Sequence, residues 1–371
     1  MSEGEICARH FATGKPVRLK CRGGFITEAT AAATAPEDLW VAPGLVDLQV
    51  NGYGGVDFQQ DDLTAGDLLK AVRQLRSAGC TRFLLTLITD EWRKLTTRLR
   101  HLRTVRSQSK ELEAAIAGWH IEGPFLSGEA GFHGAHDPAL MLDPTPEHIR
   151  ELRQITSQTP LLLTMAPERE GALEAIALAT SLHMKVSLGH TNASAEQLKR
   201  AVAAGASGFT HLGNGCPREL DRHDNILWRV FETPELTAGL IPDRIHVSGP
   251  LFRLIHRTLG ESVYYTTDAM AAAGAGPGRY KLGKLEVEVS EDEVVRQPGK
   301  TNFAGSALRP VDGVFRAAEM LGCPWQEAWK RSSIVPAKMM GLPCGVEVGQ
   351  AADFCMLQAP GNNQSWKVKV V

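Results

Sequence analysis

The sequence predicts an α/β protein: a (β/α)8 TIM-like barrel with a small β-sandwich domain formed by both chain ends. Three observations support this fold class. Apolar runs of strand length alternate with helix-like runs from about residue 45 to residue 268. Both ends of the chain instead carry short β-like pieces. Several apolar runs end in Glu, Asp or His, and a parallel barrel gathers such residues at the C-terminal ends of its strands.

The domain boundaries follow from the change in pattern. Residues 1–43 and 343–371 are interpreted as the two parts of the β-sandwich, and residues 44–342 as the barrel. The alternating segment Leu285 to Val289 indicates a β-hairpin inserted near residues 280–300. A chain of 371 residues is long enough for one large barrel with an appendage.

Each barrel element is expected where the apolar period fits it. Leu68, Val72 and Leu75 share one face of the first helix, and Ser194 is placed to cap a later one. The strands are expected at residues 45–50, 82–89, 114–125, 161–166, 186–190, 208–211, within 236–247 and at 264–268. The helices are expected at residues 63–78, 92–106, 146–155, 171–181, 194–204, 311–320, 325–331 and 336–340.

Composition excludes several classes of partner. The formal net charge is −2, with 40 Lys and Arg against 42 Asp and Glu, and no basic run suggests a nucleic-acid or membrane-surface partner. Seven cysteines form an odd set without a Cys-x-x-Cys pair, which is typical of the reducing cytoplasm. No signal segment or membrane span is visible. We expect a cytoplasmic protein with a small-molecule substrate.

Glu122, His190 and His211 each close a different predicted strand. Catalytic zinc takes three protein ligands and keeps one position open for water. It lowers the pKa of that water from 15.7 to about 7, which at about 1.36 kcal/mol per pKa unit removes roughly 12 kcal/mol from the cost of making hydroxide. Asp268, at the end of the last strand, is expected to act as general base and then as general acid on this metal-activated water. His246 is expected to polarise the scissile carbonyl.

A single histidine at a strand end is more often a structural residue than a ligand, so the metal hypothesis depends on the whole set. His120 either supports Glu122 from behind or is simply packed in the core. His133 is interpreted as a solvated loop residue, and Cys216 as a small residue in a tight turn. Arg222 is flanked by acidic residues, so it either binds an anionic substrate group or forms a solvated salt bridge.

Motifs along most of the chain carry a resemblance. They are Ala42-Pro43-Gly44-Leu45-Val46-Asp47, His120-Ile121-Glu122-Gly123-Pro124-Phe125, Gly134-Ala135-His136, Leu188-Gly189-His190-Thr191-Asn192-Ala193, Thr210-His211-Leu212, Thr267-Asp268-Ala269 and Ala304-Gly305-Ser306. With these motifs the chain resembles the N-acetylglucosamine-6-phosphate deacetylase family, within the amidohydrolase superfamily.

The resemblance implies a role for each matching residue. Glu122, His190 and His211 are the expected ligands of one divalent metal ion, with Zn²⁺ as the first candidate. Asp268 and His246 are the expected catalytic residues. The expected substrate-binding residues are Gly134, Ala135, His136, Asn214, Gly215, Arg222 and His246. Because the family's arginine at the position of Arg222 reaches the phosphate bound by the neighbouring subunit, the resemblance also implies a homodimer with shared active sites.

This chain departs from its relatives at several motif positions. Two-metal members of the superfamily carry His-x-His at the end of the first strand, where this chain has Gln49-Val50-Asn51. Amide side chains are poor zinc ligands compared with imidazole, so a single metal ion is expected. Three other departures lie at the substrate end: Asn214-Gly215-Cys216 for Asn-Ala-Met, Arg222-His223-Asp224-Asn225 for Arg-x-Pro-Gly, and Asp243-Arg244-Ile245-His246 for Asp-Gly-x-His.

The expected reaction is metal-dependent deacetylation of a phosphorylated amino sugar, N-acetylglucosamine 6-phosphate, to glucosamine 6-phosphate and acetate. One alternative is an amidohydrolase for another N-acyl substrate, such as another N-acetyl sugar phosphate, an N-acyl amino acid or a cyclic imide. A second is a catalytically silent barrel homologue that only binds or assembles. The intact set of candidate ligands, together with Asp268, favours an enzyme.

Overall fold

A parallel eight-stranded sheet forms the centre of the computed structural model, which describes residues 3–299, 303–360 and 366–371. The strand order is β14-β13-β12-β11-β10-β9-β8-β5. A parallel bridge between Val50 and Ala269 joins its two edges, so the sheet closes. The predicted TIM-like barrel is therefore confirmed. Its strands are β5 (Leu45–Val50), β8 (Cys80–Ile88), β9 (Ile116–Glu122), β10 (Leu161–Met165), β11 (Lys185–Leu188), β12 (Gly208–Phe209), β13 (Thr237–Leu240) and β14 (Val263–Tyr265).

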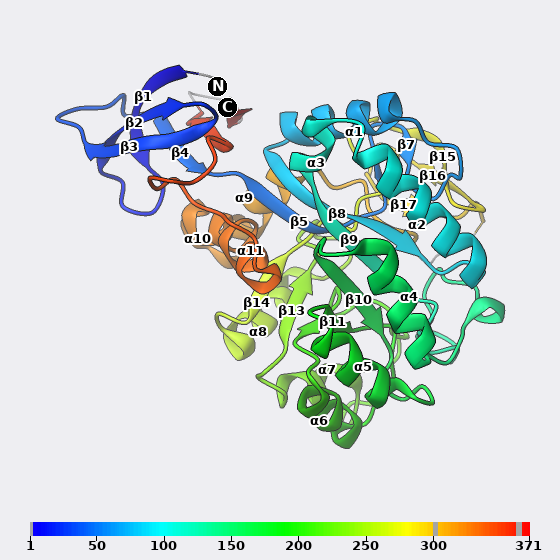
Figure 1. Cartoon of the computed structure of the whole chain (residues 1–371). Helices are drawn as coiled ribbons and strands as arrows, with labels where there is room; N and C mark the ends of the chain where they lie inside the picture. Colours follow the sequence, from blue (N-terminus) through cyan, green and yellow to red (C-terminus); the bar gives the residue numbers. More distant parts are fainter. Residues whose placement is uncertain (1–2, 300–302, 361–365) are drawn as a thin grey trace.

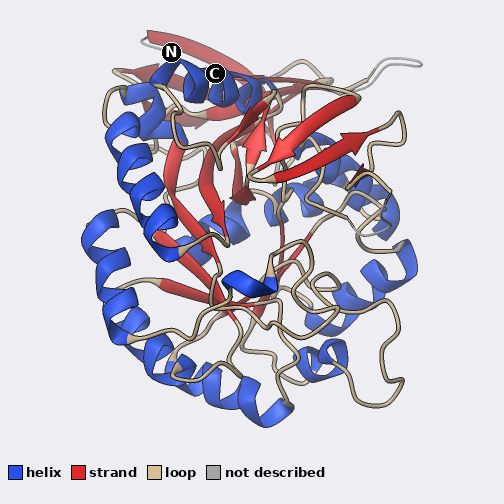
Figure 2. Cartoon of the chain, turned by 90° about the vertical axis from the view of Figure 1, so that its right-hand side faces the viewer, coloured by secondary structure: helices blue, strands red, loops and turns tan. Residues whose placement is uncertain are grey.

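Helices surround the strands as an outer layer (Figure 2). They are α1 (Ala65–Ser77), α2 (Trp92–Arg106), α3 (Lys110–Ala115), α4 (Pro146–Thr156), α5 (Ala172–Ser181), α6 (Ala195–Ala204), α7 (Ile226–Phe231), α8 (Gly249–Leu259), α9 (Pro310–Leu321), α10 (Trp325–Arg331) and α11 (Ile334–Met340), with a short 3-10 turn at Pro138–Leu140. No described helix is both long enough and apolar enough to cross a bilayer.

Local chemistry explains where these helices begin and which face they bury. In α1, Thr64 and Asp67 form a reciprocal capping box, and the predicted apolar face of Leu68, Val72 and Leu75 is buried. The sequence analysis missed α3, α7 and α8. The first two have only six residues each, too few to show a period. Helix α8 opens with Gly-Pro, a pair that usually marks a break, although Pro fits the first turn of a helix.

A buried layer of polar side chains lies inside the barrel below the strand ends. His120 Nε2 is 2.8 Å from Thr164 Oγ1, which is itself 2.8 Å from Thr210 Oγ1. Thr210 in turn donates to Ser187 Oγ at 2.7 Å. Burial lowers the pKa of His120 to about 4, so its ring is neutral. Because its two ring nitrogens face Thr164 and Thr86, the structure favours the second alternative for His120, a residue packed in the core.

Both chain ends pair in one mixed six-stranded sheet beside the barrel, as expected, and the two termini lie close together (Figure 1). The order β19-β18-β4-β1-β2-β3 places the C-terminal strands against the N-terminal ones. Leu19, Ile26 and Phe354 belong to its separate small core. The strands are β1 (Glu3–His10), β2 (Pro16–Arg22), β3 (Phe25–Ala31), β4 (Leu39–Pro43), β18 (Phe354–Gln358) and β19 (Lys367–Val370).

The expected inserted hairpin is part of a three-stranded sheet after the last barrel strand. Its strands are β15 (Gly278–Leu282), β16 (Leu285–Val289) and β17 (Val295–Arg296). The predicted strand β16 pairs with β17 through Val289 and Val295, and β15 is an additional strand that was not predicted. Residue 300, the expected end of the insertion, lies outside the described residues. The remaining strands, β6 (Gly52–Tyr53) and β7 (Val56–Asp57), form a two-stranded hairpin.

Candidate active site

A cavity of about 620 Å³ opens at the C-terminal ends of the barrel strands. This volume is in the usual range for small-molecule sites, about 300–1,000 Å³. Every residue to which the sequence analysis gave a role in metal binding, catalysis or substrate binding lines this cavity, except Arg222. The barrel thus brings together side chains that are far apart in the sequence.

Three of these side chains project from left-handed backbone. His190, His211 and Asp268 have φ values of 49°, 31° and 52°, a region that residues other than glycine rarely adopt. Each lies just beyond the end of its strand, because the chain turns sharply there. The strands predicted to extend to these residues are therefore shorter than expected. Such backbone costs about 1–3 kcal/mol per residue and is concentrated at functional sites.

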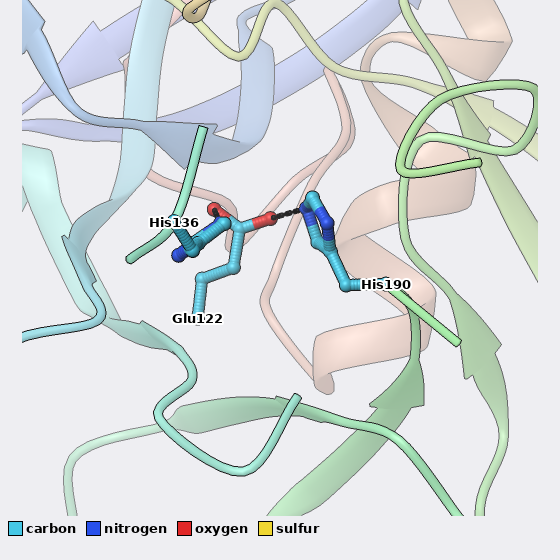
Figure 3. Close-up of side chains that lie close together, drawn as sticks. All are labelled: Glu122, His136 and His190. Atoms are coloured by element: carbon cyan, nitrogen blue, oxygen red, sulfur yellow. Dashed lines mark ion pairs between the residues drawn. The ribbon is translucent and has the colours of Figure 1, made fainter. Parts of the chain in front are cut away.

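Glu122, the last residue of β9, forms the centre of the polar cluster (Figure 3). Its Oε1 lies 2.9 Å from His211 Nε2 and 3.4 Å from His190 Nε2. Its Oε2 lies 3.9 Å from His136 Nε2. The donor atoms of Glu122, His136 and His190 all lie within 4.8 Å of one another. The sequence analysis predicted His136 as a substrate residue, and the structure places it among the possible metal donors as well.

The orientation of His190 is fixed from both sides. Its Nδ1 donates to the carbonyl oxygen of Phe132 at 2.8 Å, so Nε2 is the ring nitrogen that faces Glu122. Gly134 and Gly215 flank the ring: a Cβ on Gly134 would lie 2.8 Å from His190 Cε1, and one on Gly215 would lie 2.8 Å from His190 Nδ1. A hydrogen bond from one ring nitrogen to a carbonyl is the usual support of a metal-binding histidine.

Protonation of the cluster follows from burial and proximity. Burial alone would raise the pKa of Glu122, but hydrogen bonds from His190 and His211 hold it well below its ordinary value. Burial lowers the pKa of His136 to about 3, so that ring is neutral. For His211, burial lowers the pKa, but the hydrogen bond to Glu122 and the charges of Glu122 and Asp268 together outweigh it, so the net shift is upward.

These residues fit a divalent metal ion. Zn²⁺ and similar ions bind imidazole nitrogen and carboxylate oxygen, and the cluster offers both on buried, closely spaced side chains. His211 faces the cluster through Nε2, which lies 2.9 Å from Glu122 Oε1, while its buried Nδ1 has no hydrogen-bond partner within the described residues. The buried negative charge of Glu122 needs a compensating positive charge. A bound cation would supply it in place of hydrogen bonds from the neighbouring histidines.

Asp268 lies three residues beyond the end of β14 and contacts Asn51 at the cavity wall. Asn51 Nδ2 donates to Asp268 Oδ1 at 2.7 Å. Burial, followed by the charge of Glu122, raises the pKa of Asp268 to about 7. A carboxyl group whose pKa lies near the working pH can both accept and release a proton.

His246 is held by an aspartate three residues before it. Its Nδ1 lies 2.6 Å from Asp243 Oδ2, and Asp243 Oδ1 also accepts the backbone N–H of His246 at 2.8 Å. Burial would raise the pKa of Asp243, but the neighbouring His246 lowers it, so the aspartate is ionised. Arg244 has a φ of 69° at the position where the resembled motif has glycine, so this departure retains the turn with a strained residue.

Arg218 and Arg222 both follow the sixth barrel strand, β12, but they lie differently with respect to the cavity. Arg222 is exposed and does not line the cavity, whereas Arg218 does. Arg218 was not predicted, because it matches none of the family motifs. Its position two residues after the Asn214-Gly215-Cys216 segment was the signal in the sequence that could have indicated it. Burial raises the pKa of Cys216, which also lines the cavity, to about 11, so it is an unreactive thiol.

Known proteins resemble the chain over most of its length, although no protein-family model matches it. The N-acetylglucosamine-6-phosphate deacetylase of Vibrio furnissii is 31% identical over 330 residues, which cover 88% of this chain and 80% of that protein. The enzyme of the same name from Mus musculus is 32% identical over 336 residues, covering 85% and 79%. This chain belongs to the N-acetylglucosamine-6-phosphate deacetylase family. A solved Mycobacterium smegmatis deacetylase variant, in complex with N-acetyl-D-glucosamine-6-phosphate, is 32% identical, with a TM-score of 0.86 and 96% of each chain covered.

Within the N-acetylglucosamine-6-phosphate deacetylase family, the departure at residues 222–225 has a structural explanation. Asn225 Oδ1 accepts the backbone N–H groups of Leu227 and Trp228, so it caps α7. Asp224 pairs with Arg229 at 2.6 Å. A cap and an ion pair thus order the loop where the family motif has Pro-Gly, and the loop still presents Arg222 on the surface.

Proposed function

We propose that this chain hydrolyses N-acetylglucosamine 6-phosphate to glucosamine 6-phosphate and acetate. The observation that carries the proposal is one cavity in which a buried carboxylate, Glu122, faces the imidazoles of His190 and His211, with Asp268 on the same lining. Membership of the deacetylase family supports the substrate, because the relatives and solved structures bear that name.

For the cofactor we propose one divalent ion, Zn²⁺ first, held by Glu122, His190 and His211. Such an ion supplies Lewis acidity: it lowers the pKa of a water molecule and polarises a carbonyl oxygen. His136, whose Nδ1 lies 2.8 Å from Thr89 Oγ1, presents Nε2 to the same region and is available to the metal or to the acetyl group. Gln49 and Asn51 occupy the position of a second metal's histidines, which supports a single ion.

Two side chains of the protein assist the reaction directly: Asp268 transfers the proton and His246 stabilises the developing charge. Asp268 takes a proton from the attacking water and returns it to the amide nitrogen as the C–N bond breaks, leaving a free amine and acetate. His246, whose Nδ1 is fixed by Asp243, donates a hydrogen bond to the acetyl oxygen as negative charge develops on it. The loops at Gly134 to His136 and Asn214 to Gly215 line the same cavity and hold the sugar.

For the phosphate we propose two cations. Arg218 lines the cavity of its own subunit, and guanidinium groups bind phosphate through paired N–H donors. Arg222 is exposed outside the cavity, which supports the proposal that it reaches the site of a partner subunit in a homodimer. The nearby Trp228 is 38% exposed, as expected of a residue that an interface covers. A cytoplasmic location, also a proposal, is supported by seven free cysteines.

A substrate comparison tests the proposal. Protein reconstituted with Zn²⁺ is assayed for acetate release from N-acetylglucosamine 6-phosphate, N-acetylglucosamine and N-acetylmannosamine 6-phosphate, and its metal content is measured. We expect about one metal ion per chain and the highest kcat/KM for the first sugar. Release only from non-phosphorylated substrates would point to a different amidohydrolase. Neither metal nor release, with several divalent ions supplied, would identify a silent homologue.

A further inference from the structure

Asn51 lies just after β5 and is buried beside the carboxylate of Asp268. The residue is 2% exposed, and its Nδ2 donates to Asp268 Oδ1 at 2.7 Å. Within the described part of the chain, no other side chain forms a hydrogen bond of this kind with that carboxylate. A hydrogen bond to one of its oxygens limits the rotation of the Asp268 carboxylate about χ1 and χ2, so this contact helps to set its direction.

The backbone of Asn51 is fixed by the closure of the barrel. Its N–H donates to the carbonyl of Ala269 at 2.7 Å, and its own carbonyl accepts the N–H of Phe58 at 3.0 Å. Ala269 follows Asp268 and pairs with Val50 across the seam between the first and last strands. The seam therefore sets the distance between the amide of Asn51 and the carboxylate of Asp268. Rotation of the amide would place two oxygens face to face, so only one orientation donates.

We infer that Asn51 is a positioning residue that aims the carboxylate of Asp268 for proton transfer in the cavity. The inference depends on the proposed function, in which Asp268 carries the proton. An amide side chain suits this positioning role because it donates a hydrogen bond at any pH and binds divalent metal ions only weakly. Asn51 lines the cavity, so the contact lies at its wall. In two-metal relatives the residue at this position binds a metal ion. In this chain Asn51 orients the carboxylate of Asp268 instead.

Asn51→Leu isolates this contact, because leucine keeps the branching of the asparagine side chain and removes its donor. We expect kcat to fall about 10- to 100-fold, since a misplacement of about 1 Å costs up to about 100-fold. KM and metal content should stay within about threefold of the wild-type values, because Asn51 is neither ligand nor substrate contact in this scheme. A fold defect would instead lower the fraction of active protein and the unfolding free energy.

Gln49→Leu is the matched control. Gln49 lies two residues earlier, near the end of β5, is also 2% exposed, and does not line the cavity. Its variant should retain kcat within about threefold. If Asn51→Leu loses no more kcat than Gln49→Leu, or if its KM and metal content change as much as its kcat, the positioning role is wrong.

Crystal structures of the wild type and of Asn51→Leu give a second readout that does not depend on activity. The carboxylate of Asp268 should change rotamer or lose order in the variant, while Glu122 and His190 stay in place. An unchanged, ordered carboxylate would overturn the inference. A wild-type protein that releases no acetate would count against the proposed function alone, because the carboxylate would still report whether Asn51 holds it.

Discussion

Replacing Gly134 by alanine tests whether the orientation of His190 controls the candidate metal centre. Gly134 has a φ of 59°, and an added Cβ would lie 2.8 Å from His190 Cε1 and 3.3 Å from His190 Nδ1. The ring has little freedom to move away. Its Nδ1 is hydrogen-bonded to the Phe132 carbonyl, and its Nε2 faces Glu122.

Two effects contribute to the expected magnitude. The left-handed backbone costs an alanine about 1–2 kcal/mol relative to glycine, and the reduced freedom of the unfolded chain offsets about 0.4–1 kcal/mol of that cost. The net loss of stability is therefore about 1 kcal/mol. In addition, ordinary carbon contacts are near 3.5–4.0 Å, so the ring of His190 must shift by roughly half an ångström or more. We expect kcat/KM to fall about 10- to 100-fold and metal to be retained less tightly.

Gly23→Ala separates the two effects. Gly23 has the same φ of 59°, but no atom lies within 4 Å of its added Cβ. Both variants should lose a similar free energy of unfolding in urea, and only Gly134→Ala should lose metal and acetate release. If Gly134→Ala keeps the metal content and kcat/KM of Gly23→Ala, the packing against His190 does not control the site and the reasoning is refuted.

Three further predictions concern proton transfer, phosphate and pH. Asp268→Asn should lower kcat about 100- to 10,000-fold with little change in KM, because that is the usual contribution of general acid–base catalysis; near-normal kcat for acetate release would remove Asp268 from this role. Arg218→Ala and Arg222→Ala should each raise KM for the phosphorylated sugar about tenfold or more and leave KM for N-acetylglucosamine unchanged; an equal rise for both sugars would contradict phosphate binding. Burial lowers the pKa of His256 to about 3, whereas an unfolded histidine titrates near 6.5. The unfolded state therefore binds more protons below pH 6.5, and the unfolding free energy should fall as the pH drops, by about 2 kcal/mol at pH 5 from this group alone. His256→Phe should remove this part of the difference between urea unfolding at pH 7.5 and pH 5, and an unchanged pH dependence would show that another group causes it.

The amino-acid sequence was enough to predict the barrel because its signals are local. Alternating apolar and amphipathic runs specify strands and helices, and parallel strands joined by helical crossovers bring their C-terminal ends to one face. For this reason the sequence by itself predicts that Glu122, His190, His211 and Asp268 meet at one end of the barrel. The cap at Ser194 and the apolar face of α1 were readable for the same reason.

Only the tertiary structure decided the contacts made by loops and by the closure of the barrel. The amide of Asn51 meets Asp268 because β5 and the segment after β14 join at the seam, although 217 residues separate the two positions. His136 approaches Glu122, and Arg218 rather than Arg222 lines the cavity, because of the course of two loops. A loop's path is set by packing against distant parts of the chain, and no local period in the sequence encodes it.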